Sequence, residues 1–368
     1  MKQKIAIISI ILLLLFFVGC QKRDSIKIGF VGPLTGNYSS VGISSRNAIN
    51  LAFEQFNLKG GLEGRPIELI VRDNKSKPKS SLAIVNELIN EGITVIFGPT
   101  TSSSATELQS FYQREDLIFI SSTVSSTLFD SIDDNHFRFI SVKDRGEKVA
   151  NYLIENNILK LLIVNDSTNE KLASTYIDDF MPRYSMQGGE MINIITYVPE
   201  ENSAYGEIAD EIIDEQPDGV IFLGDERNTA LLCQQLQKRE FETFLFTNAM
   251  TTSLSTHGGS SVEGMKMLTT FDSESEDRFY LQIKEEYEKR YSMEINFSVK
   301  RSYEASITFL DALKRDPEMT NLKASLLNRN QYPGLQGNLV MDRFGDVKRE
   351  FYIYELSRSG VHKLILEK

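Results

Sequence analysis

Short apolar segments alternate with amphipathic segments along most of the chain. Residues 26–31 form a β-branched and aromatic run that Gly32 and Pro33 end, and residues 43–56 then place apolar side chains at helical spacing. The same order recurs, with further strands expected at 67–71, 93–97, 117–120, 159–164, 192–198 and 219–223. Repeated alternation of strands and helices predicts parallel sheets whose two faces are covered by helices.

The pattern changes after residue 270. Polar helices are expected at about 275–291 and 301–314, and the chain then ends in two alternating strands, 339–341 and 351–356. A glycine-containing segment, 342–346, predicts a hairpin-like turn between these strands. The earlier strands fall into two groups, near 93–128 and 159–238, which suggests two sheets.

Length and charge narrow the class of protein. The chain has 368 residues, of which 41% are hydrophobic, so it is long enough for two domains, each with a core. Its net charge is −11, from 40 basic and 51 acidic residues. That sign disfavours nucleic acid as a partner, because nucleic-acid binding requires an excess of Lys and Arg.

The N-terminus has the pattern of an export signal. Lys2 and Lys4 precede an apolar run, 5–18, that is shorter than the roughly 20 residues a membrane helix needs, and Gly19 and Cys20 follow. These residues resemble the lipobox of bacterial lipoproteins, although Phe17 stands where Leu is more usual. The resemblance implies a signal peptide over 1–19, a lipidated Cys20 with a tether over 20–25, and an extracytoplasmic location.

An uncleaved anchor helix with an incidental cysteine is the alternative for this segment, and it also leaves the remaining chain outside the cytoplasm. The other cysteine, Cys233, lies in an apolar helical stretch, where we expect a buried thiol without a role. Two cysteines exclude a disulfide scaffold for a chain of this size.

Two successive turns between a strand and a helix are dense in hydroxyl groups, at 100–106 and 121–127. In open parallel sheets, ligands bind outside the carboxyl ends of the strands. Hydroxyl groups at those ends supply hydrogen-bond donors for a carboxylate, although the same residues also serve as helix caps. Their occurrence in both turns favours a ligand site.

Several motifs together resemble the leucine/isoleucine/valine-binding type of substrate-binding protein, a class of extracytoplasmic receptors of ABC importers. The motifs run in order through nearly the whole chain after the leader: Ile28-Gly-Phe-Val-Gly-Pro-Leu-Thr-Gly36, Lys59-Gly-Gly-Leu-Glu-Gly64, Gly98-Pro-Thr-Thr-Ser-Ser-Ser104, Tyr303-Glu-Ala305, and Gly337-Asn-Leu-Val-Met-Asp342 with Gly345-Asp346. The resemblance implies an α/β fold with two doubly wound parallel-sheet lobes joined by a three-strand hinge. By position, the first lobe is 26–141 plus 270–338, and the second is 142–269 plus 339–368.

The resemblance also implies site residues in the first lobe. The hydroxyl of Ser102, with Ser103 beside it, is expected to meet the α-carboxylate of an amino acid. Thr123 is expected to offer its backbone carbonyl to the ammonium group, and Ser125 to offer its hydroxyl and backbone N–H.

The second lobe departs from the family. The family's usual aromatic residue after the fourth strand is replaced by 165–170, and its usual acid by the turn 246–251. An ammonium group could instead meet Asp225 or Glu226, at the end of strand 219–224, although a solvated acidic turn explains these residues equally well. Three tyrosines are candidates for pocket walls: Tyr38, Tyr176 and Tyr205.

Catalytic chemistry has little support in the sequence. The three histidines are isolated, and neither a His-Glu-x-x-His motif nor a Gly-x-Ser-x-Gly elbow occurs, so we expect no enzyme, no metal and no cofactor. The sequence therefore predicts a lipid-anchored receptor that binds a small amino acid or related carboxylate and delivers it to an ABC permease. A sensing lipoprotein of the same fold, not coupled to import, is the first alternative, and a hydrolase is the second.

Overall fold

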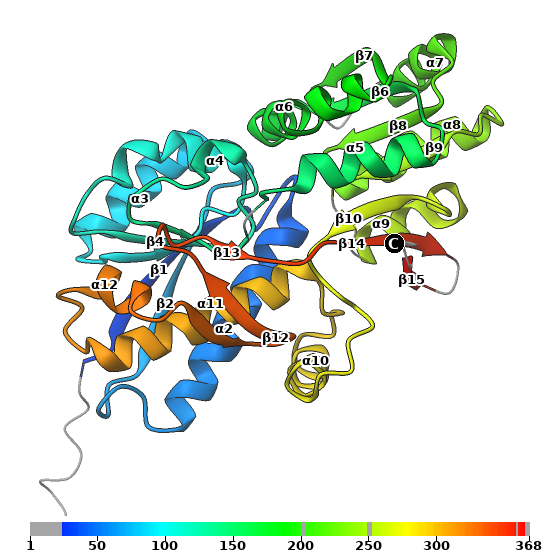
Figure 1. Ribbon diagram of the computed structural model, residues 1–368. Coiled ribbons are helices and arrows are strands. Elements are labelled where there is room, and N and C mark those ends of the chain that lie inside the picture. The colour runs from blue at the N-terminus through cyan, green and yellow to red at the C-terminus, as the bar shows by residue number, and fades with distance from the viewer. Residues whose placement is uncertain (1–23, 141, 200–203, 249–251, 358–359, 365–368) are drawn as a thin grey trace, which may run out of the picture.

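The computed structural model describes residues 24–140, 142–199, 204–248, 252–357 and 360–364, which form two α/β lobes (Figure 1). The first lobe is built on a five-stranded sheet in the order β2-β1-β3-β4-β5, with every neighbouring pair parallel. Its strands are β1 (Ile26–Gly32), β2 (Ile67–Asp73), β3 (Val95–Phe97), β4 (Ile118–Ser121) and β5 (His136–Arg138). Its helices are α2 (Ser39–Leu58), α3 (Ser80–Asn90), α4 (Ser102–Glu107), η1 (Gln109–Phe111), η2 (Thr127–Phe129), α10 (Arg278–Tyr291), α11 (Phe297–Arg315) and α12 (Leu322–Leu327).

The second lobe is built on a seven-stranded sheet in the order β15-β14-β10-β9-β8-β6-β7, in which β14 is antiparallel to both its neighbours, β10 and β15, and all other neighbouring pairs are parallel. Its strands are β6 (Lys160–Asp166), β7 (Glu190–Tyr197), β8 (Gly219–Leu223), β9 (Phe244–Thr247), β10 (Lys266–Thr269), β14 (Tyr352–Ser357) and β15 (Gly360–Leu364). Its helices are α5 (Arg145–Glu155), η3 (Ser167–Asn169), α6 (Glu170–Met186), α7 (Tyr205–Glu215), α8 (Glu226–Lys238), α9 (Thr252–Gly258) and η4 (Gly259–Val262). The predicted parallel sheets covered by helices are thus confirmed.

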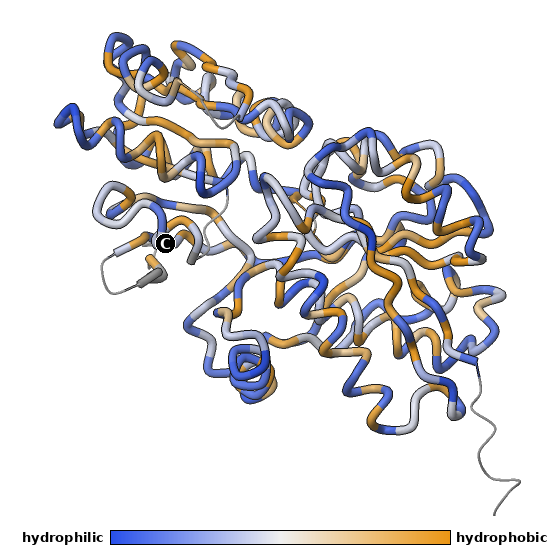
Figure 2. The backbone as a smooth tube through the Cα atoms, turned by 180° about the vertical axis from the view of Figure 1, so that it is seen from behind, coloured by the Kyte–Doolittle hydropathy of each residue, from blue (hydrophilic) through white to orange (hydrophobic). Residues whose placement is uncertain are grey.

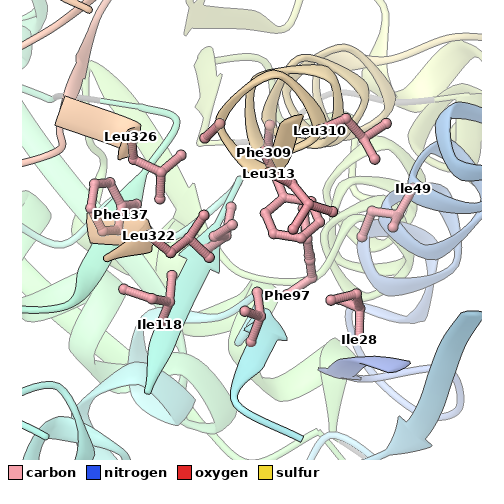
Figure 3. Packing of buried hydrophobic residues seen from close by; sticks show 14 of the residues in the cluster. Ile28, Ile49, Phe97, Ile118, Phe137, Phe309, Leu310, Leu313, Leu322 and Leu326 are labelled. Carbon is pink, nitrogen blue, oxygen red and sulfur yellow. The ribbon is translucent and has the colours of Figure 1, made fainter. Parts of the chain in front are cut away.

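The central strands of each sheet, such as β3, β4 and β8, are buried on both faces, which explains their continuous apolar sequences. Hydrophobic residues are concentrated along the strands at the centre of each lobe (Figure 2). In β3 the side chains alternate: Phe97 packs under α2 and α11, whereas Ile96 packs under α3 and α4. The rings of Phe97 and Phe309 meet edge to face at 5.6 Å in the first of these layers (Figure 3). In the second lobe Cys233 is free and buried between α8 and the sheet, as predicted.

The C-terminal tail differs from the expected hairpin. The turn at 342–346 joins β12 (Gly337–Met341) to the two-residue β13 (Val347–Lys348), and β11 (Gln331–Gly334) completes a small antiparallel sheet. The strand expected at 351–356 instead pairs with β10 of the second lobe. Leu339 and Val347 are buried in the core of the first lobe, so 339–348, which are predicted to belong to the second lobe, pack on the first. A two-residue strand is too short to be detected from periodicity.

Three connections cross between the lobes, and their described residues are 139–140 with 142–144, 270–277 and 349–351. No helix within the described ranges is both long and apolar enough to cross a membrane. The expected signal peptide, 1–19, and Cys20 lie outside the described residues.

Candidate functional site

A cavity of about 90 Å³ lies between the two lobes, and residues of both lobes and of the crossovers form its wall. The first lobe contributes the turns that follow β3 and β4, together with Tyr38 and Val41 near the start of α2. The second lobe contributes the beginning of α5, residues of α6, and Asn248 after β9. The cavity is therefore at the carboxyl ends of parallel strands, where this class of sheet binds ligands.

Three of the predicted site residues, Ser102, Thr123 and Ser125, lie on this wall. Thr123 donates its hydroxyl to the carbonyl of Thr100 at 2.7 Å, which ties the two hydroxyl-rich turns together. The helix-capping alternative also holds for some neighbours: Thr101 accepts the N–H of Ser104, and Ser126 accepts the N–H of Leu128. The two turns thus contain both capping residues and wall residues.

Gly98 allows the chain to enter the first of these turns. Its φ angle is +106°, and a Cβ atom there would lie 2.1 Å from the carbonyl oxygen of Val31. Any other residue would be strained and would also collide with the backbone of β1. The position of Ser102 therefore depends on this glycine.

Ser103, Asp225 and Glu226, which were predicted as ligand contacts, are not on the wall but join the lobes beside it. Ser103 donates its backbone N–H to Asn169 Oδ1 at 3.1 Å, and its hydroxyl accepts the N–H of Lys171 at 3.2 Å. Asp225 and Glu226 contact the start of α2 in a separate set of hydrogen bonds. We call these two sets the interlobe contacts.

Asp225 Oδ2 accepts the backbone N–H of Tyr38 at 2.7 Å, and Glu226 Oε2 accepts the hydroxyl of Ser40 at 3.3 Å. The other carboxylate oxygen of Asp225 caps α8 by accepting the N–H of Arg227. Because both sets of interlobe contacts are formed, the lobes are in direct contact on either side of the cavity. The structure is therefore a closed one.

Of the three tyrosines predicted as pocket walls, two lie on the cavity wall and one does not. Tyr38 and Tyr176 line the cavity, whereas Tyr205 donates its hydroxyl to Asn228 at 2.8 Å and is not on the wall. Tyr38 is buried at the N-terminus of α2, and burial together with the charge of Asp166 raises the pKa of its hydroxyl well above the usual value. The phenol is therefore a neutral part of the wall.

Two arginines on the wall, Arg145 and Arg301, were missed by the sequence analysis. Arg145 stands at the start of α5, where its Nε donates to Asp179 at 3.0 Å and its Nη1 donates to the carbonyl of Ser125 at 2.9 Å. Its guanidinium also lies over the ring of Tyr176, 4.4 Å from the centroid. Arg145 thereby joins the second lobe to the predicted turn of the first.

Arg301 stands in the second turn of α11 and donates its Nη2 to Thr270 Oγ1 at 2.6 Å. Burial, together with the charge of Arg349, lowers its pKa to about 9. Both effects disfavour a positive charge at this position. An anion in the cavity would counteract them.

The first turns of α11 contact the second and third crossovers directly, and the first crossover through Arg349. Arg301 and Lys300 bind Thr270 of the second crossover, Lys300 through its Nζ at 3.4 Å from the carbonyl. Glu304 pairs with Arg349 of the third crossover at 2.7 Å, and Arg349 Nε donates to the carbonyl of Phe139 in the first at 2.8 Å. A buried cluster of charges thus connects the hinge to the wall of the cavity.

On the part of the wall that the structure describes, there is no carboxylate, histidine, cysteine or lysine. The remaining wall is aromatic and aliphatic, with Phe297, Met267 and Phe351 among its residues. Within the described residues no cluster of metal-ligating side chains occurs either. This arrangement can enclose a small solute with an apolar body and offer it hydroxyl and guanidinium donors.

Two α/β lobes, three crossovers and a cavity between the lobes define a type I binding-protein fold. A family model described as periplasmic binding protein matches residues 25–360, and the chain belongs to that family. The family consists of extracytoplasmic binding proteins rather than enzymes.

The leucine-, isoleucine-, valine-, threonine- and alanine-binding protein of Pseudomonas aeruginosa is 31% identical over 103 residues, which are 28% of each protein. The match therefore covers less than a third of that relative. A leucine-binding protein of Thermotoga maritima superposes with a TM-score of 0.81 and 18% identity, over 92% of this chain and 98% of that one. A solute-binding protein of R. palustris, solved with benzoate, superposes with a TM-score of 0.82 and 16% identity, over 92% of this chain and 95% of that one. At these identities the structural similarity establishes the fold.

Proposed function

We propose that this protein is a lipid-anchored receptor that captures a small amino acid or related carboxylate between its lobes and delivers it to an ABC permease. The cavity closed by interlobe contacts on both sides is the observation that carries the proposal. A solute that fits this cavity contacts both lobes and therefore favours the closed state over an open one. The membership of the family supports the extracytoplasmic location, and Cys20 supplies the anchor.

The related proteins support the ligand class. One curated relative is named for five aliphatic or small amino acids, and one structural neighbour was solved with benzoate. Both kinds of ligand carry a carboxylate. In our proposal Ser102 and Ser125 donate hydrogen bonds to that carboxylate, and Thr123 lies beside them on the wall.

A thermal-shift screen of amino acids, amides, small carboxylates and short peptides tests the proposal. A ligand at 100 times its dissociation constant stabilises the folded state by about 2.7 kcal/mol, which the screen detects. Small-angle scattering with the best ligand should show a smaller radius of gyration than without it. Saturation without compaction, or a panel in which nothing binds, would contradict the proposal.

Serine variants then test the predicted donors. Ser102→Ala and Ser125→Ala should each weaken a carboxylate ligand roughly tenfold, because a hydrogen bond to a charged group is typically worth about 1.5–3 kcal/mol. Ser104→Ala is a matched control, since Ser104 is buried in the same turn but is not on the wall. Unchanged affinity in both folded serine variants would show that the carboxylate is bound elsewhere.

A further inference from the structure

The cavity wall contains two guanidinium groups that have donors without partners. Arg145 and Arg301 are both more than nine-tenths buried, with 5% and 6% of their surface exposed. Arg145 Nη2 and Arg301 Nε are shielded from solvent, and neither has a hydrogen-bond partner among the residues that the structure describes. A buried N–H of a charged group without a partner is costly, so these two atoms indicate a missing acceptor.

The two arginines come from different lobes and are held in place by their other atoms. Arg145, on α5, is fixed by Asp179, by the carbonyl of Ser125 and by the ring of Tyr176. Arg301, on α11, is fixed by Thr270, and its guanidinium lies 4.9 Å from the centroid of the Phe297 ring. Neither guanidinium needs to reorganise before it binds an anion, which favours tight binding.

The charges around the two arginines differ. Arg145 is paired with Asp179, so its charge is balanced within the protein. Around Arg301 stand Lys300 and Arg349, whereas Glu304 pairs with Arg349 and also accepts the N–H of Leu335. Among the described residues neither Arg301 nor Lys300 forms a salt bridge with a carboxylate, and of these two cations only Arg301 lies on the wall of the cavity.

An ammonium group finds no anionic partner on the described wall, where its predicted acceptor is the neutral backbone carbonyl of Thr123. No carboxylate is present there, and Asp225 and Glu226 are occupied by the interlobe contacts. Two carbonyl oxygens near the predicted turns, those of Thr100 and Ser125, already accept hydrogen bonds from Thr123 and Arg145. A buried ammonium without an anionic partner is strongly unfavourable.

We propose that the ligand is a small monocarboxylate with an apolar body and no ammonium group, and that Arg301 and Arg145 bind its carboxylate. This inference rests on the proposed capture between the lobes and specifies the chemistry of the solute. Guanidinium groups suit this task because their planar donors match the geometry of a carboxylate. The apolar part of the ligand packs against wall residues such as Leu172, Met267 and Phe351.

Matched ligands test the proposal on the unmodified protein. Valine, leucine and phenylalanine are each compared by calorimetry with the acid that lacks only the amino group: 3-methylbutanoate, 4-methylpentanoate and 3-phenylpropanoate. Benzoate and benzylamine form a fourth pair. We expect at least one of the four carboxylates to bind about tenfold or more tightly than its amino-containing partner, and benzylamine not to bind.

The two proposals fail in different ways. If the amino acids bind more tightly than their deaminated partners, the monocarboxylate proposal is overturned while the receptor function stands. If no compound of these pairs or of the wider screen binds, the proposed function is overturned with it.

Arginine variants provide an independent test with the best carboxylate of the panel. Arg301→Gln and Arg145→Gln should each weaken its binding by about tenfold or more, because each removes a charged donor. Arg315→Gln is the control on the same helix, since Arg315 pairs with Asp311 and is not on the wall. Arg301→Lys, which keeps the charge but loses the fork of donors, should be intermediate. If both glutamine variants remain folded by circular dichroism and bind the carboxylate unchanged, the proposal is wrong.

Discussion

Tyr38 donates its backbone N–H to Asp225 across the two lobes, at 2.7 Å. Tyr38 has a left-handed backbone, with φ of 59°, at the N-terminus of α2, and Asp225 precedes α8. The carboxylate of Asp225 therefore serves two helices, because it caps its own and accepts an N–H from the other lobe. A residue with this double role links helix capping in one lobe to closure of the cavity.

Asp225→Asn should weaken closure while keeping the helix cap. Asn is as good an N-cap residue as Asp, but its neutral oxygen accepts a weaker hydrogen bond from Tyr38. We expect ligand affinity to fall by about fivefold, which corresponds to about 1 kcal/mol, with little change in the melting temperature. Isothermal calorimetry with the best ligand of the screen measures the effect.

Asp277→Asn is the matched control for this variant. Asp277 caps α10 by accepting the N–H groups of Phe279 and Tyr280, and it is not part of the interlobe contacts. The control should bind ligand as the unmodified protein does. Equal affinities for all three proteins would show that the bond between Tyr38 and Asp225 does not contribute to closure.

Gly98→Ala should destabilise the protein far more than Gly92→Ala. Both glycines have positive φ angles, +106° and +79°, but an added Cβ meets the carbonyl of Val31 at Gly98 and nothing within 4 Å at Gly92. Gly92→Ala should therefore cost about 1 kcal/mol through backbone strain alone, and Gly98→Ala should cost several times as much. Urea unfolding of both variants measures this difference, and similar costs would mean that the contact with β1 relaxes easily.

The strands and helices of the two lobes could be predicted because their apolar periodicity is local. The strand expected at 219–223 has those bounds in the structure, as β8, and each of the other expected parallel strands is present. The pairing of the C-terminal strand β14 could not be predicted, because its partner, β10, lies more than 80 positions earlier in the chain. Sequence periodicity carries no information on which strand is the neighbour.

The site could be predicted only in part, for a related reason. Ser102, Thr123 and Ser125 follow strands of one sheet, and the rule for parallel sheets places such residues together. Arg145 and Arg301 sit within amphipathic helices, where a charged residue usually indicates a solvent-exposed face. The crossovers cover that face of α11, so Arg301 is buried. The burial of Arg301 at the cavity therefore becomes visible only in the tertiary structure.

Cys20→Ala should prevent anchoring of the mature protein. The prediction depends on the charged start, the short apolar run and Gly19 before Cys20. Membrane fractionation and intact mass measurement should show either release from the membrane or an uncut precursor. Cys233→Ala is the control, because Cys233 is free and buried in the second lobe. Normal maturation and partitioning of the Cys20 variant would contradict the lipobox interpretation.

Lys300 should make the stability of the protein depend on pH between 7 and 9. Burial lowers its pKa from 10.5 to about 7, against the opposing charge of Glu304. Arg301, Arg349 and Asp272 are the other charged groups that act on it. In this range the unfolded chain keeps the proton and the folded protein loses it. Because the unfolded state then binds more protons, the free energy of unfolding rises with pH.

Lys300→Met removes this titration while preserving an unbranched side chain. Between pH 7 and pH 9 the unmodified protein should gain about 2 kcal/mol of stability relative to the variant. Other groups that titrate in this range, such as Cys233 in the unfolded chain, are common to both proteins and cancel in the difference. Lys314→Met is the control on the same helix, because Lys314 is exposed. Urea unfolding at several pH values measures the difference, and parallel profiles for the unmodified protein and Lys300→Met would show that Lys300 stays protonated in the fold.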